Sequence, residues 1–241
     1  MKIMIINPDY GVSQEAMLLR CHILKQYTAP DTELNMVCPQ RTKVEINSAL
    51  DVALAAPEIV SLAVQAQNDG YDAVVLYCFS DPAIEACRET LRIPVIGGAQ
   101  ASCLAALNIC RSFGVMLADD IRLPEKKRFL RTLGVDPSCI GQIAAADLQG
   151  IDPWNNREAA LARLAVCGRK MASDGAEAIV LGCLSFLGLA NPLSEILGIP
   201  VIDPAAAAVT TAESIVRQGL FTSKVSYPLL SPLAREEIKI I

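Results

Sequence analysis

The sequence is short of the residue patterns that metal and nucleotide sites use. It contains a single histidine, His22, and none of its nine cysteines forms a C-x-x-C pair. Structural zinc sites draw on closely spaced cysteine and histidine ligands, so this spacing argues against a bound metal ion. No glycine-rich phosphate-binding loop of either common type is present. These residues predict neither a metal site nor a nucleotide cofactor.

Basic charge is also scarce, and long apolar runs are missing. The chain has 21 lysines and arginines against 26 acidic residues, a formal net charge of −5. Nucleic acids and anionic membranes bind basic faces, so we expect a small-molecule partner and neither of these. The apolar run at the N-terminus stops at Asn7-Pro8, too early for an export signal or a membrane span. An odd number of cysteines without such a signal predicts reduced thiols and a cytoplasmic location.

The rhythm of the chain predicts an α/β fold. Its 241 residues, 52% of them hydrophobic, are enough for one large domain or two modest lobes. Short apolar runs predict strands at 2–6, 33–38, 72–77, 93–97, 112–117, 140–144, 177–182 and 199–203. Helical patterns lie between them at 13–27, 57–68, 82–92, 120–133, 156–173, 189–197 and 205–218. Continuous apolar strands that alternate with helices are typical of parallel sheets covered on both faces.

An internal repeat divides this rhythm into two copies. The segment "DGYDAVVLYCFS" (69–80) aligns without a gap with "DGAEAIVLGCLS" (174–185), with seven identities in twelve positions. Further on, "LRIPVIG" (91–97) aligns with "LGIPVID" (197–203) after a slip of one residue. We therefore predict two similar α/β lobes, each a parallel sheet flanked by helices and related by a pseudo-two-fold axis.

Two cysteines occupy the same place in the two copies. Cys78 and Cys183 stand at the carboxyl end of the third strand of each repeat, and no other cysteine is matched within the aligned blocks. In open α/β sheets, ligands bind outside the carboxyl ends of the strands. Both thiols are therefore expected where ligands bind, although packing of two homologous buried thiols, a redox pair or a single nucleophile also fits the pattern.

Facing thiols suit the inversion of a carbon centre. With an active site in the interlobe cleft, one cysteine would remove a proton as a thiolate and the other would deliver one to the opposite face. The Ser80-Asp81-Pro82 segment is predicted as the N-terminus of a helix, whose N–H groups would favour both a thiolate and an enolate. Such chemistry requires no metal and no pyridoxal cofactor. A non-catalytic two-lobed binding protein has no need for matched thiols.

Several segments resemble one known family, the Asp/Glu/hydantoin racemase superfamily, and within it the hydantoin racemase group. The stretch "YCFSDPAIEACRETLRIPVIG" (77–97) resembles that group's first cysteine motif, Cys-Phe-Gly-Asp-Pro followed by a helix and Ile-Pro-Val. The stretch "VLGCLSFLG" (180–188) resembles its second, Leu-Gly-Cys-Ala-Gly-Met. The opening "IINPD" is similar to Ile-Asn-Pro-Asn, and "IPVIDPAAAAV" to the closing Pro-Val-Ile-Asp segment. The resemblance spans residues 1 to about 220.

This resemblance implies an enzyme that works without cofactor or metal, with Cys78 and Cys183 as acid and base. It also implies that the chain crosses between the lobes twice, so that residues 1–96 with 205–241 form one lobe and residues 97–204 the other. Asn7, which matches the family's opening Asn, would bind a substrate oxygen.

The family and the tail at 226–241, where apolar residues stand between prolines, together suggest a homo-oligomer.

Departures from the family pattern bear on the substrate. Asp9 and Tyr10 stand where the family opening continues Asn-Thr or Asn-Ser, and those lost donors would have held a carboxylate or carbonyl. Ser80 and Ser185 each replace the glycine two residues after a cysteine. Acidic or bulky replacements disfavour a carboxylate substrate, whereas a neutral ring such as a hydantoin suffers less.

The residues that follow the cysteines are expected to line the pocket: Phe79, Ser80, Leu184 and Ser185. Phe79 and Phe186 fit the core of a lobe equally well. The sequence thus favours a cofactor-independent racemase or epimerase of the hydantoin racemase type. A maleate-type cis–trans isomerase, a decarboxylase of the same superfamily and a non-catalytic binding protein are the alternatives.

Overall fold

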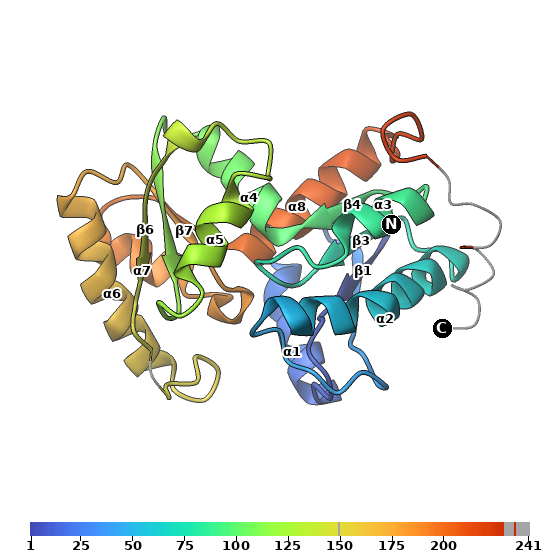
Figure 1. The fold of residues 1–241 in the computed structure, drawn as a ribbon, viewed down its shortest axis with the longest axis horizontal. Coiled ribbons are helices and arrows are strands. Elements are labelled where there is room, and N and C mark those ends of the chain that lie inside the picture. The colour runs from blue at the N-terminus through green and yellow to red at the C-terminus, as the bar shows by residue number, and fades with distance from the viewer. Residues whose placement is uncertain (149, 229–233, 235–241) are drawn as a thin grey trace. The chain divides into compact units, whose positions relative to one another are not determined.

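The computed structural model describes residues 1–148, 150–228 and 234 (Figure 1). The chain divides into two compact units. Unit 1 comprises Met1–Gly97 and, as far as it is described, Ala208–Ile241, and unit 2 comprises Gly98–Ala207. The sequence placed the corresponding crossings at 96/97 and 204/205. Each unit is an α/β structure built on its own sheet.

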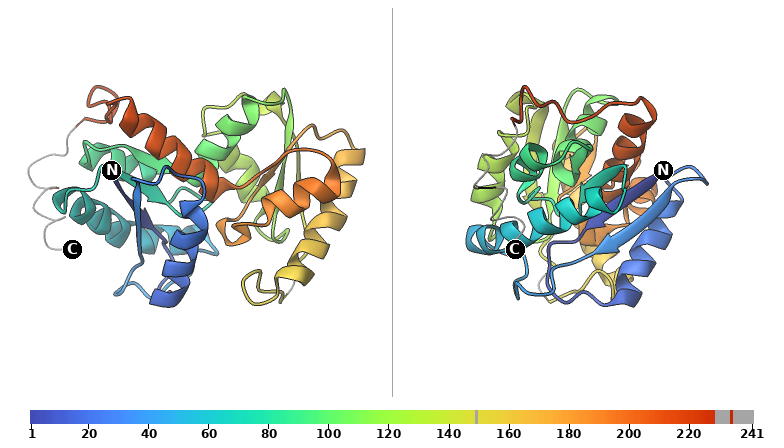
Figure 2. Two further views of the ribbon diagram at one scale, coloured as in Figure 1. Left: turned by 180° about the vertical axis from the view of Figure 1, so that it is seen from behind. Right: turned by 90° about the vertical axis from the view of Figure 1, so that its right-hand side faces the viewer.

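Unit 1 contains a four-stranded parallel sheet of order β2-β1-β3-β4. Its helices α1 and α2 lie on opposite faces of this sheet (Figure 2). In chain order the elements are β1 (Lys2–Ile6), α1 (Gln14–Lys25), β2 (Glu33–Val37), α2 (Ala49–Asn68), β3 (Ala73–Leu76), α3 (Ile84–Thr90) and β4 (Val95–Gly97). The final helix, α8 (Pro204–Arg217), begins in unit 2 and continues into unit 1.

Unit 2 repeats this topology with the order β6-β5-β7-β8, again all parallel. Its helices are α4 (Gly98–Leu107), α5 (Leu123–Leu130), α6 (Arg157–Ser173), α7 (Ala190–Leu197) and two 3₁₀ turns, η1 (Pro137–Cys139) and η2 (Leu184–Phe186). Its strands are β5 (Phe113–Leu117), β6 (Ile140–Ala145), β7 (Ile179–Leu181) and β8 (Val201–Ile202). The predicted fold class, two similar α/β lobes each on a parallel sheet, is confirmed.

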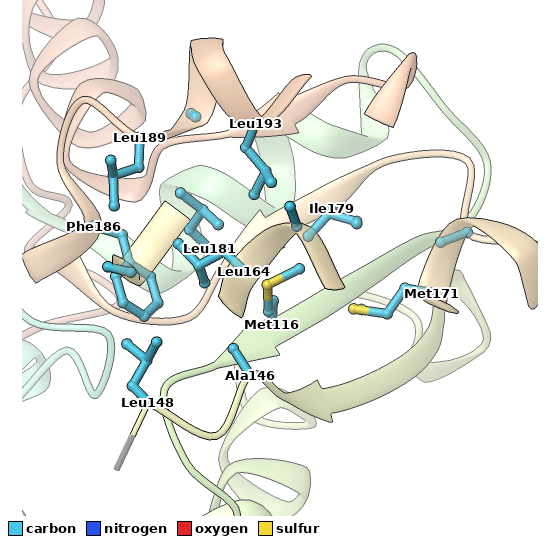
Figure 3. Packing of buried hydrophobic residues seen from close by; sticks show 14 residues of the cluster. Met116, Ala146, Leu148, Leu164, Met171, Ile179, Leu181, Phe186, Leu189 and Leu193 are labelled. Carbon is cyan, nitrogen blue, oxygen red and sulfur yellow. The ribbon is translucent and has the colours of Figure 1, made fainter. Parts of the chain in front are cut away.

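Alternate residues of the central strands face a helical layer in each unit, because side chains of a strand point to opposite faces in turn. In unit 2, Met116 of β5 and Ile179 and Leu181 of β7 pack on Leu164 of α6 and Leu193 of α7 (Figure 3). The matching face of unit 1 is formed by side chains of β1, β3, α2 and α3: Met4, Ile6, Val74, Leu76, Ile59, Ala63 and Cys87. In each unit, an apolar core between the sheet and its helices therefore supports the strands whose carboxyl ends carry the cysteines.

The repeat seen in the sequence is also a repeat of backbone hydrogen bonds. Tyr77 N–H donates to the carbonyl of Ile6 at 2.8 Å, and Gly182 N–H donates to the carbonyl of Met116 at 2.7 Å. Each donor stands immediately before one of the two aligned cysteines. Cys78 and Cys183 therefore leave equivalent strands in equivalent register.

The helices differ from the prediction in two main places: α2 is longer than expected, and α4 was not expected. The helix expected at 57–68 begins eight residues earlier, because Ser48 caps it by accepting from Asp51 N–H, and Pro57 lies inside it. Helix α4 was not predicted at all. Its buried residues are Gly98, Ala99, Ala101, Ser102, Cys103 and Ala106, so small side chains replace the amphipathic period that reveals a surface helix.

Among the described residues one helix, α2, is long and apolar enough to cross a membrane by length and composition alone. Its Ile59, Ala63 and Ala66 lie in the core of unit 1, as a core helix of this composition would. The tail at 226–241, which suggested subunit contacts, lies largely outside the described residues.

Candidate active site

Asn7 and Cys78 both lie at the carboxyl edge of the unit 1 sheet. They follow the neighbouring strands β1 and β3, whose last paired residues are Ile6 and Leu76. Adjacent parallel strands bring their carboxyl ends to one edge, where ligands bind in open α/β sheets. Two residues from distant segments, both expected in the site from the sequence, thus stand at the same edge of the sheet.

The Asn7 side chain is held by the loop that follows it. Its Oδ1 accepts from Asp9 N–H at 3.2 Å, and only 2% of the residue is exposed. Asp9 is itself occupied, because its Oδ1 accepts from Ile46 N–H at 2.9 Å. The Nδ2 donor of Asn7 has no hydrogen-bond partner among the described residues, so it is available to an oxygen atom of a ligand.

The loop after Cys78 is a strained turn and not the helix start that the sequence predicted. Asp81 and Ala83 both have positive φ, 42° and 59°, and Asp81 N–H donates to the Cys78 carbonyl at 3.1 Å. Such a conformation costs about 1–2 kcal/mol for a residue like Ala83. Ser80 therefore does not cap α3, which begins at Ile84 with Ala83 as N-cap and no side-chain cap.

The turn buries the Asp81 carboxylate against the end of β4. Its carboxyl carbon and both oxygens fill the space where a Cβ atom on Gly97 would stand, and only 4% of Asp81 is exposed. Gly97 thus permits a close approach that any side chain would prevent. No role for Asp81 beyond the predicted cap was expected from the sequence.

In unit 2 the cysteine begins a helical turn directly. Cys183 is the extended N-cap residue of η2, and Phe186 N–H donates to its carbonyl at 3.3 Å. The Cys183 Sγ lies 2.9 Å from the Ser185 Oγ. A hydroxyl that donates to sulfur favours the thiolate over the thiol. Ser185, expected to contact substrate, therefore contacts the thiol itself.

The apolar residues beside the thiols are buried. Phe79 is 3% exposed and Leu184 2%. The Leu184 methyl groups lie 3.2 Å from the place of a Cβ on Gly98, so they cover the start of α4. Phe186 is fully buried and belongs to the core of unit 2 (Figure 3), which decides between the two roles that the sequence left open for it. Ser80 stays partly exposed in the turn after Cys78.

Four of the other seven cysteines have a raised pKa. None of the nine, all of which lie in the described part of the chain, forms a disulfide. Burial raises the pKa of Cys87 to about 12 and the pKa of Cys21 to about 11. Burial also raises the pKa of Cys110 and of Cys167.

Within the described part of the chain, no three His, Cys, Asp or Glu side chains gather as a metal ligand set.

Comparison with known proteins agrees with this geometry. Residues 3–212 match the family model described as Asp/Glu/Hydantoin racemase. The hydantoin racemase of Rhizobium meliloti is 32% identical over 245 residues, 99% of each chain. The structure of allantoin racemase from Klebsiella pneumoniae has a TM-score of 0.82 at 30% identity, over 95% of this chain and 94% of that one. Allantoin racemase from Pseudomonas fluorescens has a TM-score of 0.87 at 25% identity, with 96% and 98% covered.

The family model covers most of the chain, and a relative at 32% identity matches it over nearly its full length. Together these two findings identify the family. The chain belongs to the Asp/Glu/hydantoin racemase family and is an isomerase of the racemase type.

Proposed function

We propose that the protein racemises a small hydantoin-like ring through Cys78 and Cys183, without metal or organic cofactor. The observation that carries the proposal is the equivalence of the two cysteines, which leave β3 and β7 in the same register. The hydantoin and allantoin racemases among the similar proteins support the choice of ring.

The proposed reaction is a pair of proton transfers at the ring carbon next to a carbonyl. One cysteine, as thiolate, removes the proton, and the electron pair of the C–H bond passes into an enolate. The other, as thiol, returns a proton to the opposite face, so the two sulfurs exchange protonation states in one turnover. The reverse direction uses the same groups with their roles exchanged.

Substrate orientation is proposed to come from Asn7. Its free Nδ2 donor would bind a ring carbonyl oxygen, which gains negative charge as the proton leaves. The equivalent position in unit 2 is Leu117, because Ile6 and Met116 pair with equivalent residues of β3 and β7. Only one of the two repeats therefore supplies this donor. A neutral ring that needs one amide donor, at the carbonyl next to the reacting carbon, fits this asymmetry better than a dicarboxylate does.

We propose that Phe79, Ser80, Leu184 and Ser185 shape the space around the ring. Phe79 and Leu184 supply apolar surface next to each thiol, and Ser185 holds the Cys183 sulfur. The further proposals are a homo-oligomer, a cytoplasmic location and a small molecule as the only substrate, with neither nucleic acid nor membrane as a partner.

Proton exchange in D₂O tests the reaction directly. Enantiopure allantoin and 5-substituted hydantoins are incubated with the enzyme. NMR follows exchange of the C5 proton for deuterium, and the circular dichroism signal of the substrate follows racemisation. The wild type is expected to do both, whereas Cys78→Ser and Cys183→Ser each lose racemisation by several orders of magnitude. Racemisation that survives in both variants contradicts the two-thiol mechanism.

Product analysis separates the alternatives. A decarboxylase releases carbon dioxide, a maleate-type isomerase changes double-bond geometry, and a racemase yields the mirror image alone. A non-catalytic binding protein yields no product and needs no reactive thiol, so its cysteines would alkylate with an ordinary pH dependence.

A further inference from the structure

One peptide group in unit 2 is held between two opposite charges. The Leu187 carbonyl accepts from the Arg157 guanidinium at 3.0 Å, and the Gly188 N–H donates to the Asp203 carboxylate at 2.8 Å. These two atoms belong to the same peptide bond. The cation thus lies at the negative end of the peptide dipole and the carboxylate at its positive end, and both charges favour one orientation.

Both charged groups are themselves fixed. Asp203 is 6% exposed, and its second oxygen accepts from the N–H groups of Ala205 and Ala206 at 2.9 and 3.3 Å. Burial raises the pKa of Asp203, while these N–H groups, that of Gly188 and the charge of Arg157 oppose the rise. Arg157 lies at the start of α6, with its guanidinium 5.6 Å from the centre of the Trp154 ring.

The clamped peptide ends the loop that begins at Cys183. Between them lies the 3₁₀ turn η2, closed by Phe186 N–H on the Cys183 carbonyl and by Leu187 N–H on the Leu184 carbonyl. Gly188 has a φ of 79°, a left-handed conformation that favours glycine. The turn is therefore fixed at both ends, by β7 before Cys183 and by the clamp after it.

Ser185 contacts the sulfur from within this turn. Its Oγ lies 2.9 Å from the Cys183 Sγ, and this distance depends on where the turn is held. A hydrogen bond weakens steeply when its geometry is lost. Arg157, 26 residues before Cys183 in the chain, and Asp203, twenty residues after it, can therefore act on the thiol without touching it.

We propose that Arg157 and Asp203 are positioning residues for Cys183: they clamp the Leu187–Gly188 peptide and so hold the Ser185 hydroxyl against the thiol. The inference rests on the proposed function only in taking Cys183 as a reacting thiol. Its effect is confined to that cysteine, because every contact of the clamp lies in unit 2.

Alkylation of the full-length chain by iodoacetamide measures the reactivity of the Cys183 thiol without any substrate. The rate at each cysteine is followed by mass spectrometry of its peptide across a pH series, so Cys78 serves as the control within every sample. Asp203→Asn keeps the shape but loses the charged acceptor. We expect it to raise the midpoint of the Cys183 profile by about one pH unit, as loss of one hydrogen bond to the thiolate implies.

Arg157 is the second position to vary. Its side chain is only partly buried, so substitutions there disturb the fold less than those at Asp203. Arg157→Met is expected to raise the Cys183 midpoint in the same direction. Arg157→Lys, which keeps a cation and a donor for the Leu187 carbonyl, is expected to restore most of the wild-type profile. This series also decides the question if the Asp203 variant fails to fold.

Combination with Ser185→Ala tests the route. Ser185→Ala alone should raise the Cys183 midpoint, and addition of Asp203→Asn or Arg157→Met should change it little further, because the hydroxyl through which they act is gone. Additive effects in the double variants overturn the proposed route.

The remaining outcomes are equally decisive. Equal changes at Cys78 and Cys183, or no change at Cys183 in a folded variant, overturn the inference. Racemisation is assayed separately: a wild type that does not racemise rejects the proposed function, while a selective change at Cys183 still supports the clamp. In an active enzyme, the variants should lower kcat about tenfold with little change in KM.

Discussion

The carboxylate of Asp81 occupies the space beside Gly97 in which a Cβ atom would stand. Gly97 ends β4, and the residue aligned with it in the second repeat is Asp203, at the end of β8. Each unit thus places one buried carboxylate between its cysteine loop and the adjacent strand end. In unit 1 the loop supplies it, and in unit 2 the strand end does.

Gly97→Ala tests the unit 1 contact. The new methyl group must displace the Asp81 carboxylate, and with it the turn that follows Cys78. We expect about 10–100-fold less racemase activity, since an ångström of misplacement is enough for such a loss. Gly141→Ala in β6 is the control, because its Cβ meets the rotatable hydroxyl of Ser112 and no residue proposed to contact the ring. Equal activity in the two variants would contradict the role given to Asp81.

Gly182→Ala addresses the second thiol. A Cβ at Gly182 would stand 2.9 Å from the Met116 carbonyl oxygen, a backbone atom that the sheet holds in place. The strand end must therefore move and carry Cys183 with it, at a cost of about 1–3 kcal/mol in stability. We expect racemisation to fall about 100-fold.

The control for this variant is Gly141→Ala in β6, whose Cβ meets the rotatable hydroxyl of Ser112. It is expected to remain active and to melt close to the wild type. A Gly182→Ala enzyme with wild-type kcat would show that the close approach to β5 does not place the thiol.

The sequence predicted the sheets well because buried parallel strands are nearly continuous apolar runs, and all eight appear within two residues of their predicted starts. The internal repeat placed both cysteines at the carboxyl ends of strands, and the family resemblance pointed to Asn7; their roles stay predictions. The contacts of Asp81, Arg157 and Asp203 were not predicted, because they cross loops that no local pattern encodes. Helix α4 was not predicted either, because its small residues leave no helical period.

The nine thiols should differ widely in reactivity. Because burial raises the pKa of Cys87 to about 12 and the pKa of Cys21 to about 11, few of these thiols are ionised at neutral pH. At neutral pH we expect Cys21 to alkylate about 100-fold and Cys87 about 1,000-fold more slowly than an unperturbed thiol. Iodoacetamide labelling read by peptide mass spectrometry should find Cys78 and Cys183 modified first. Preferential labelling of any other cysteine would favour a non-catalytic binding protein.

Glu58 is predicted to make the folding stability of unit 1 depend on pH in the acidic range. Its carboxylate, 5% exposed on α2, accepts from the backbone N–H groups of Gln40, Arg41 and Thr42 at 2.8, 3.1 and 2.8 Å. Burial alone would raise the pKa of Glu58, but the three N–H groups together outweigh it and hold the pKa below its ordinary value of 4.5.

A carboxyl whose pKa is lower in the folded than in the unfolded chain stabilises the fold above the unfolded value, and this contribution is lost as the pH falls through the folded value. The melting temperature of the wild type should therefore fall as the pH drops below the ordinary glutamate value of 4.5, partly through protonation of Glu58. Glu58→Gln should be less stable by about 1–3 kcal/mol at neutral pH and should lose less on acidification.

Thermal melting followed by circular dichroism at several pH values measures both effects. Glu85→Gln is the matched control, since the Glu85 side chain is 69% exposed on α3 and pairs with Arg88 only at 3.7 Å. That variant should follow the wild-type curve, because exposed ion pairs contribute little to stability. If Glu58→Gln and the wild type lose stability in parallel as the pH falls, the three N–H groups do not hold the carboxylate in its charged form.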